Sequence, residues 1–501
     1  MTEQQLRIMI GQHLVSGFRG PVITEEFKKI VKEWKIGNII FFSNNVTSLK
    51  QLNILCSEVD DLIFQETGYH PIITIDQEGG MVSRLPEGSP VLPSQMALAS
   101  LNDEALIEEV SFLNGQMLKA LGITINLSPV LDVNTNLSNP VIGVRSFSSS
   151  PETVARFGCA SIRGYNRAQI LSSAKHFPGH GDTGVDSHLA LPMVNRTLEE
   201  LSPELLPFKA AIASHVPAVT TSHILFPEIE KEKIPCTMSR TILTGLLRNQ
   251  LGFDGIILSD CMEMNAIAKY YGTIEGSILS LKAGADLVFI SHHADIAAQV
   301  IEKCVKLYQE GHFSNELEDS NRRIKKVKEK LGKIEIIDTS RFDSLIKYYD
   351  DIQKRTIKLV HGSLEHVTGK LAFVGPEAYI TSNISDKLDR VSFPDALSSM
   401  FPGSESFLIA CEPAEDEIQR LADNVDADTI VFGTYNGHLQ KGQLEAMKAL
   451  KKKGHRIIHF ALRNPYDVND ESTSIADASF TSFEYSTRCF KAIAEIIKEA
   501  L

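Results

Sequence analysis

The 501-residue sequence lacks the features that would place it outside the ordinary globular class. Hydrophobic residues make up 43% and charged residues 23%, which is near average globular usage and excludes a disordered or fibrous chain. Basic residues are in deficit, 50 Lys and Arg against 63 Asp and Glu. We therefore expect no nucleic-acid partner, because phosphate binding needs a basic face. No run of about 18 apolar residues occurs, so we expect no membrane-spanning helix and no membrane partner.

The seven cysteines lack the pattern of a disulfide framework. Their number is odd, they are scattered along the chain, and no C-x-x-C pair occurs, which is typical of a reduced protein. The N-terminal residues contain no basic segment followed by an apolar run, so the sequence predicts no secretory signal. We therefore expect a cytoplasmic protein. Nothing in the pattern specifies an oligomeric state.

Short β-rich runs alternate with amphipathic stretches of helical length over the first two thirds of the chain. The predicted strands start at His13, Asn38, Pro71, Ile123, Leu171, Ala218, Gly255 and Ala285. Helical patterns cover residues 24–34, 49–66, 102–120, 151–168, 201–213, 240–250, 274–282 and 295–309. Apolar strands between helices imply a parallel sheet covered on both faces, and eight such units close a (β/α)8 TIM barrel. A doubly wound open α/β sheet is the alternative that periodicity leaves open.

Two further segments follow the predicted barrel. The charged segment EDSNRRIKKVKEKLGKIEI predicts a solvated helix rather than a nucleic-acid contact, since acidic residues interrupt the basic ones. A second α/β pattern starts near Gly369, with predicted strands in KLAFVG, SFLIAC, DTIVFGTY and HRIIHFALRNPYD. We therefore expect a catalytic barrel domain over 1–335, a linker over 336–366 and a smaller C-terminal αβα sandwich domain over 367–501. The second domain contains no catalytic constellation that we recognise.

Titratable and polar residues gather at the C-terminal ends of the predicted strands, where barrel enzymes carry their active sites. From the third to the seventh strand these are Asp76 and Glu78, Asp132 and Arg145, Lys175 and His176, Ser222 and His223, and Ser259 and Asp260. Single residues of this kind are often helix caps. Convergence from five strands instead favours a substrate site. For Asp260 itself, position alone fits a nucleophile and an N-cap equally well.

The segment KHFPGHGDTGVDSH, residues 175–188, is the richest in the chain. It contains a formal G-x-G-x-x-G from Gly179 to Gly184. A dinucleotide site would need a helix to open there, and the following DSHLALP has no helical period and ends in Pro192. A metal cluster of the three histidines is also disfavoured, because Pro178 and Gly179 oppose the helical spacing of such ligands.

An acid/base loop is the better interpretation of this segment. Asp186 precedes His188 by two residues, so its carboxylate can bond one imidazole nitrogen. That bond fixes the tautomer and raises the basicity of the ring, which leaves the other nitrogen to give and take a proton near neutral pH.

Four ordered segments resemble the signatures of glycoside hydrolase family 3: ITIDQEGGMVSRLP, SPVLDVNTNLSNPVIGVRSF, KHFPGHGDTGVDSHLALP and GFDGIILSDCMEMNAI. The third is similar to the β-N-acetylglucosaminidase (NagZ-like) branch rather than to the β-glucosidases. The resemblance covers roughly residues 5–335. The C-terminal part, with ALRNPYD, resembles the second αβα domain of the two-domain members.

The resemblance implies a role for each residue that matches a motif. Asp260 corresponds to the nucleophile that forms a covalent glycosyl-enzyme, His188 to the general acid/base, and Asp186 to its polarising partner. Five others resemble the residues that hold the sugar hydroxyls and the acetamido group: Asp76, Arg84, Arg145, Lys175 and His176. Met81 departs from the pattern, since Arg or Lys often follows the double glycine.

The expected activity is retaining hydrolysis of terminal, non-reducing β-linked N-acetylglucosamine, with peptidoglycan-derived muropeptides as the substrate class. A small carbohydrate is then the expected partner, and no cofactor or metal is implied. A phosphorylase is the first alternative, because a neutral histidine does not repel phosphate. A β-glucosidase or β-xylosidase of the same family is the second. A non-catalytic sugar-binding protein is the third, and the intact Asp260, Asp186 and His188 argue against it.

Overall fold

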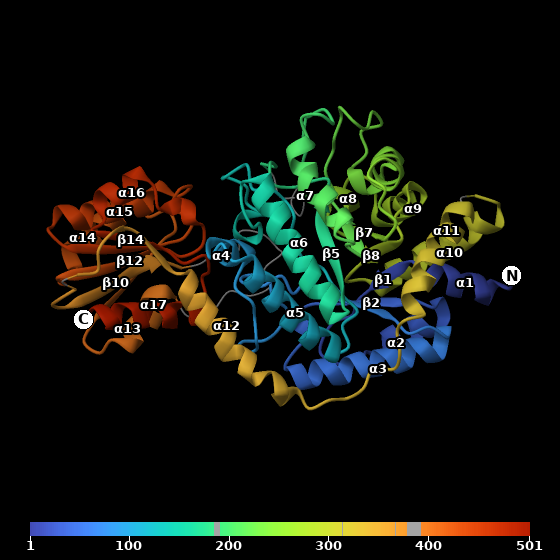
Figure 1. The fold of residues 1–501 in the computed structure, drawn as a ribbon, viewed down its shortest axis with the longest axis horizontal. Coiled ribbons are helices and arrows are strands. Elements are labelled where there is room, and N and C mark those ends of the chain that lie inside the picture. The colour runs from blue at the N-terminus through green and yellow to red at the C-terminus, as the bar shows by residue number, and fades with distance from the viewer. Residues whose placement is uncertain (185–190, 313, 366, 378–391) are drawn as a thin grey trace.

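The computed structural model describes residues 1–184, 191–312, 314–365, 367–377 and 392–501 (Figure 1). Its first part is a closed barrel of eight parallel strands in chain order, which confirms the predicted (β/α)8 fold and excludes the open sheet. The strands are β1 (Leu14–Ser16), β2 (Asn38–Phe41), β3 (Ile72–Ile75), β4 (Ile125–Asn126), β5 (Leu171–Phe177), β6 (Ala218–Thr221), β7 (Ile256–Cys261) and β8 (Leu287–Ile290). Within the described residues, no helix is long and apolar enough to cross a membrane.

Helices surround the barrel (Figure 1). Those predicted from periodicity are α2 (Glu25–Trp34), α3 (Leu49–Thr67), α5 (Glu104–Ala120), α6 (Pro151–Ala168), α7 (Ser202–Ala213), the π-helix η4 (Thr241–Gln250), α9 (Thr273–Ala283) and α10 (Ala294–Gln309). Many start at a Ser, Thr or Asp whose side chain accepts a hydrogen bond from a backbone N–H of the first turn, as Thr24 and Ser150 do. Among the described α-helices of the barrel domain, those that periodicity did not predict are α1 (Glu3–Gly11), α4 (Gln95–Ser100) and α8 (Asn265–Ala268).

Alternate residues of the strands pack into two different clusters. Val15 and Ile40 belong to an inner cluster of strand residues, whereas their neighbours Leu14 and Ile39 belong to the large cluster that includes the surrounding helices. Side chains of successive strand residues point to opposite sides of the sheet. One set therefore fills the inside of the barrel, and the other set packs against the surrounding helices.

The charged segment after the barrel forms α11 (Ser314–Lys328), and the prediction of a solvated helix is wrong for one of its faces. Ile324 is fully buried in the inner cluster of the barrel. The amine of Lys328 is also buried and donates hydrogen bonds to Gln12 Oε1 at 2.6 Å and to the Gly37 carbonyl at 2.9 Å. Burial lowers the pKa of Lys328 well below its usual value. The helix therefore covers the end of the barrel opposite the C-terminal ends of the strands.

The second domain is a six-stranded sheet in the order β11-β10-β12-β13-β14-β9. Its strands are β9 (Lys358–Gly362), β10 (Leu371–Pro376), β11 (Glu405–Ile409), β12 (Thr429–Thr434), β13 (Arg456–Ala461) and β14 (Ala478–Thr481). Its helices are α13 (Phe393–Met400), α14 (Glu415–Asn424), α15 (Lys441–Lys452), α16 (Asp470–Ile475) and α17 (Thr487–Ala500). All described pairs are parallel except β14 with β9.

Both faces of this sheet are covered, as expected for an αβα sandwich. Phe373 of β10 packs in the cluster that holds residues of α13 and α17, and its neighbour Val374 packs in the cluster that holds residues of α14, α15 and α16. The segment 336–366 contains more structure than a linker: α12 (Asp343–Thr356) runs from the barrel to the second domain, and β9 joins the sheet as an edge strand (Figure 1).

Candidate active site

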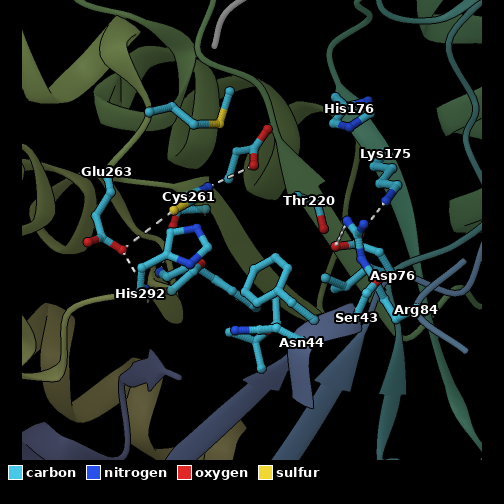
Figure 2. Close-up of a pocket in the computed structure, with 18 of the residues that line it drawn as sticks. Ser43, Asn44, Asp76, Arg84, Lys175, His176, Thr220, Cys261, Glu263 and His292 are labelled. Carbon is cyan, nitrogen blue, oxygen red and sulfur yellow. Dashed lines mark hydrogen bonds and ion pairs between the residues drawn. The ribbon is translucent and has the colours of Figure 1, made fainter. Parts of the chain in front are cut away.

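A pocket of about 760 Å³ lies at the C-terminal ends of the barrel strands. It is lined by Asp260 and by all five residues expected to hold the sugar: Asp76, Arg84, Arg145, Lys175 and His176. Figure 2 shows Asp76, Arg84 and Lys175 on one side of the pocket and Cys261, Glu263 and His292 on the other. The fold brings together side chains from the strand ends, as the sequence predicted, although they are up to 184 positions apart in the sequence (260 − 76).

Asp76, directly after β3, is the centre of one charged cluster. Its Oδ1 accepts a hydrogen bond from Lys175 Nζ at 2.8 Å, and its Oδ2 lies 3.3 Å from Arg84 Nη2. Burial alone would raise the pKa of the Asp76 carboxyl, but the charges of Lys175 and Arg84 hold it well below its usual value. Asp76 is therefore ionised and can accept hydrogen bonds.

Glu78 connects the lysine to a second arginine. Both carboxylate oxygens of Glu78 accept hydrogen bonds from Arg145, at 2.8 Å each, and Oε1 lies 2.6 Å from Lys175 Nζ. Against the effect of burial, Arg145 and Lys175 lower the pKa of Glu78 to about 2. Burial also opposes the charge of Lys175, yet the nearby carboxylates raise the pKa of its amine. Glu78, whose position after a strand predicted no particular role, orients both cations.

The double glycine after Glu78 is required by close packing. Gly79 and Gly80 have positive φ values of 105° and 55°. A Cβ on Gly79 would lie 2.7 Å from the Pro93 carbonyl oxygen, and one on Gly80 would lie 2.7 Å from the Ser94 Cβ. No side chain fits at either position, so the turn can bring Glu78 back toward the barrel only with glycine.

Asp132 organises the histidine-rich segment. Its carboxylate, fully buried, accepts hydrogen bonds from the backbone N–H groups of His176 and His180 and from the His176 ring Nδ1 at 2.7 Å. Burial would raise the pKa of Asp132, but His176 lowers it. His180 is buried away from the pocket, bonded to the Thr183 hydroxyl at 2.7 Å, and burial with the charge of His176 lowers its pKa to about 4. His176 thus reaches the pocket wall with its orientation fixed.

Gly181, the second glycine of the G-x-G-x-x-G, is required by packing. Gly181 approaches the Val133 carbonyl so closely that a Cβ would lie 1.7 Å from its oxygen. The first helix described after β5 is α7, which starts at Ser202. Asp186 and His188, the predicted acid/base pair, lie outside the described residues.

Asp260 is the penultimate residue of β7 and lines the pocket. Its Oδ1 accepts a hydrogen bond from the Cys261 backbone N–H at 2.7 Å. The N-cap of the next helix, α8, is Met264, so the alternative in which Asp260 caps that helix is wrong. Near it, His223 is not in the pocket lining: its ring bonds the Thr237 hydroxyl and the Cys261 carbonyl and thereby supports the end of β7.

Further pocket residues were not predicted. The polar pair Ser43–Asn44 follows β2, and Glu263 and His292 follow β7 and β8. The first pair carries the same signal as Asp76, a polar residue directly after a strand. Glu263 and His292 are 29 residues apart (292 − 263), and only their contact in the fold identifies them as neighbours.

Met81 packs against a core cluster of the second domain, not in the pocket lining. The segment after β4 also contacts that domain: Asn134 Nδ2 donates to Tyr466 Oη at 2.7 Å, and the Leu137 carbonyl lies 3.1 Å from His438 Nε2. The departure at Met81 is therefore explained by a neighbouring domain. The loops that carry Arg84 and Arg145 are supported from outside the barrel.

A (β/α)8 barrel with a carboxylate at the end of β7 and a charged, sugar-sized pocket defines the class of barrel glycoside hydrolases. The family model described as the N-terminal domain of glycosyl hydrolase family 3 matches residues 4–327. The chain belongs to glycosyl hydrolase family 3.

Three similar proteins illustrate the relationship. The structure of a family 3 beta-N-acetylglucosaminidase from Paenibacillus sp. str. FPU-7 is 34% identical, with a TM-score of 0.88 over 99% of this chain and 97% of that one. NagZ from Neisseria gonorrhoeae, solved with N-trifluoroacetyl-D-glucosamine, is 30% identical, with a TM-score of 0.57 over 68% of this chain and 97% of that one. Beta-hexosaminidase A of Pseudoalteromonas piscicida is 33% identical over 61% of this chain, and the match spans only 55% of its length.

Proposed function

We propose that this protein is a retaining glycoside hydrolase that removes terminal, non-reducing β-linked N-acetylglucosamine. The observation that carries the proposal is that Asp260 and the network of Asp76, Lys175 and Arg84 line the same pocket. The names of the relatives, beta-N-acetylglucosaminidase and beta-hexosaminidase, support the choice of sugar.

In the first step Asp260 attacks the anomeric carbon, and the protonated His188 donates its proton to the glycosidic oxygen as that bond breaks. In the second step neutral His188 takes a proton from water, and the hydroxide attacks the anomeric carbon and releases Asp260. Two inversions leave the product with the β configuration of the substrate. Imidazole, with a reference pKa of about 6.5, suits both steps near neutral pH.

The rest of the pocket binds the sugar in this proposal. Ionised Asp76 accepts hydrogen bonds from sugar hydroxyls, and Lys175 and Arg84 donate to hydroxyl or acetamido oxygens. The Cys261 N–H holds Oδ1 of Asp260 in place, so the carboxylate is oriented before the substrate arrives. We infer that muropeptides released from peptidoglycan are the preferred substrates, with chitobiose as the comparison.

The test of the nucleophile is Asp260→Ala, which we expect to abolish turnover of an aryl β-N-acetylglucosaminide. Asp254→Ala is the matched control, since Asp254 is exposed at the opposite end of β7 and should keep full activity. Proton NMR of the first product formed by the wild-type enzyme should show the β-anomer. An α-anomer would rule out the double displacement.

The test of the acid is His188→Ala. It should reduce hydrolysis of chitobiose or a muropeptide about 100-fold or more, and reduce hydrolysis of an aryl glycoside with a good leaving group far less. Full activity of this variant on the disaccharide would contradict the assignment. Hydrolysis and phosphorolysis are distinguished by analysing the products with phosphate present and absent, because sugar 1-phosphate forms only in phosphorolysis.

A further inference from the structure

A second cluster of reactive side chains lies on the pocket wall opposite Asp76 (Figure 2). Cys261 Sγ, a carboxylate oxygen of Glu263 and a ring nitrogen of His292 all lie within 4.8 Å of one another. Cys261 ends β7, Glu263 follows it, and His292 follows β8. The proposed hydrolysis gives these three side chains no chemical task.

The ligand set selects a class of cation. One sulfur, one oxygen and one nitrogen donor suit zinc-type dications, whereas a thiolate is a poor ligand for calcium or magnesium. Three protein ligands leave the fourth position of a tetrahedral ion open to water.

The surrounding contacts hold two of the three ligands in place. Glu263 Oε2 accepts a hydrogen bond from the His292 backbone N–H at 2.7 Å, and Oε1 is paired with His293 Nδ1. The His292 ring packs on Phe42 with a centroid distance of 4.7 Å. Such partners orient metal ligands in proteins and raise the affinity of a site.

We propose that Cys261, Glu263 and His292 bind a zinc-type divalent cation, and that the bound ion inhibits the glycosidase. On binding, the Cys261 S–H bond breaks, its proton goes to solvent, and a sulfur–metal bond forms. The ion then lies in the substrate pocket beside Asp260, whose Oδ1 is bonded to the Cys261 N–H at 2.7 Å. Its positive charge weakens Asp260 as a nucleophile, and its volume competes with the substrate. The inhibitory part rests on the proposed function, and the binding part does not.

The binding test uses the full chain without substrate. Titration with Co²⁺ should produce a thiolate-to-cobalt charge-transfer band, and Zn²⁺ should remove it by competition. Cys261→Ser should abolish the band, and His292→Gln should weaken Zn²⁺ binding about tenfold or more. Cys159→Ser is the matched control, because Cys159 is a half-buried thiol on α6. The cobalt band and the Zn²⁺ affinity of this variant should equal those of the wild type.

Two outcomes would overturn the site: the absence of a thiolate band in the wild type, or equal Zn²⁺ affinity in the wild type and both variants. Circular dichroism checks that each variant is folded, and if Cys261→Ser does not fold, His292→Gln decides. For the inhibitory part, Zn²⁺ should inhibit the wild type and Cys159→Ser alike, and His292→Gln about tenfold less, each relative to its own rate without metal. Tight binding without inhibition would refute that part and leave the hydrolase proposal intact.

Discussion

At the scale of single residues, Glu78 holds two cations that line the pocket. It is almost fully buried, and it bonds Arg145 through both oxygens and Lys175 through one. A buried carboxylate is stable only when such partners compensate its loss of hydration. Arg145 and Lys175 therefore depend on Glu78 for their position, and Asp76 shares Lys175 with it.

Glu78→Gln tests this dependence. The amide keeps the shape but loses the charge, which leaves Arg145 and Lys175 under-compensated and should cost about 3 kcal/mol of the free energy of unfolding at pH 7. KM for the aryl glycoside should rise more than kcat falls, because two side chains proposed to bind the sugar lose their orientation. Urea unfolding and steady-state kinetics are the measurements, with exposed Glu87→Gln as the control.

The same variant has a defined pH dependence. The pKa of Glu78 is about 2 in the folded protein against a usual value of 4.5, so its stabilisation is complete above about pH 4.5 and is lost as pH falls toward 2. The difference in stability between wild type and Glu78→Gln should therefore shrink between pH 6 and pH 3. A difference that stayed constant over this range would contradict the ionised state of Glu78.

At the scale of elements, hydrophobic periodicity predicted every barrel strand, because buried parallel strands are nearly continuous apolar runs. It missed α1 and the short helices α4 and α8, which are too short to show a helical period. The charge pattern gave the wrong environment for α11, because charge alone does not reveal that Lys328 and Arg323 find buried partners. The edge strand β9 was missed since its residues are exposed and carry no buried-strand pattern.

The candidate site was predictable only in part, because local sequence indicates strand ends but not long-range pairings. Position at the C-terminal end of a strand identified Asp76, Lys175 and Asp260, since the fold brings all strand ends together. Pairings such as Glu78 with Arg145, 67 residues apart, depend on where loops return, and no local pattern records that. The assignments of Asp186 and His188 stay predictions.

The short 3-10 turn η2 (Gly143–Arg145) is the element that presents Arg145. Gly143 has a φ of 46°, and a Cβ there would lie 2.8 Å from Asn464 Oδ1 of the second domain. Gly143→Ala should therefore displace the turn and raise KM several-fold. Gly252→Ala is the control: its φ of 71° imposes similar backbone strain, about 1 kcal/mol, with open space around the added methyl.

The double variant Gly143→Ala/Asn464→Ala sharpens this measurement. Removing the amide that the new methyl contacts should recover part of the lost affinity for substrate. If the double variant were no better than Gly143→Ala, or if Gly252→Ala raised KM as much, the contact with Asn464 would not be the cause.

At the scale of the whole molecule, the second domain supports the active-site loops of the barrel. The ALRNPYD segment provides part of this contact: Asn464 faces Gly143, Tyr466 bonds Asn134, and Asp467 bonds His438, whose ring reaches Leu137. The motif thereby supports a loop next to the pocket without contributing a catalytic group that we recognise.

Met81→Lys tests the contact between domains. The charge would be placed against the apolar cluster of the second domain and should lower the melting temperature by several degrees, with faster proteolysis between the domains. Leu137→Lys is the control, because the Leu137 side chain is 47% exposed and should accept a charge at little cost. Equal melting temperatures for Met81→Lys and wild type would show that the contact contributes nothing to stability.

The pairing of β9 with β14 bears on the order in which the protein matures. The last barrel strand is complete once residue 290 has left the ribosome, whereas β9 must wait for residues 478–481 before its partner exists. With the covering helix α11, the barrel is complete at residue 328, and β14 starts 150 residues later (478 − 328). The pocket loops obtain their outer supports from His438, Asn464 and Tyr466, which are made long after the last barrel strand.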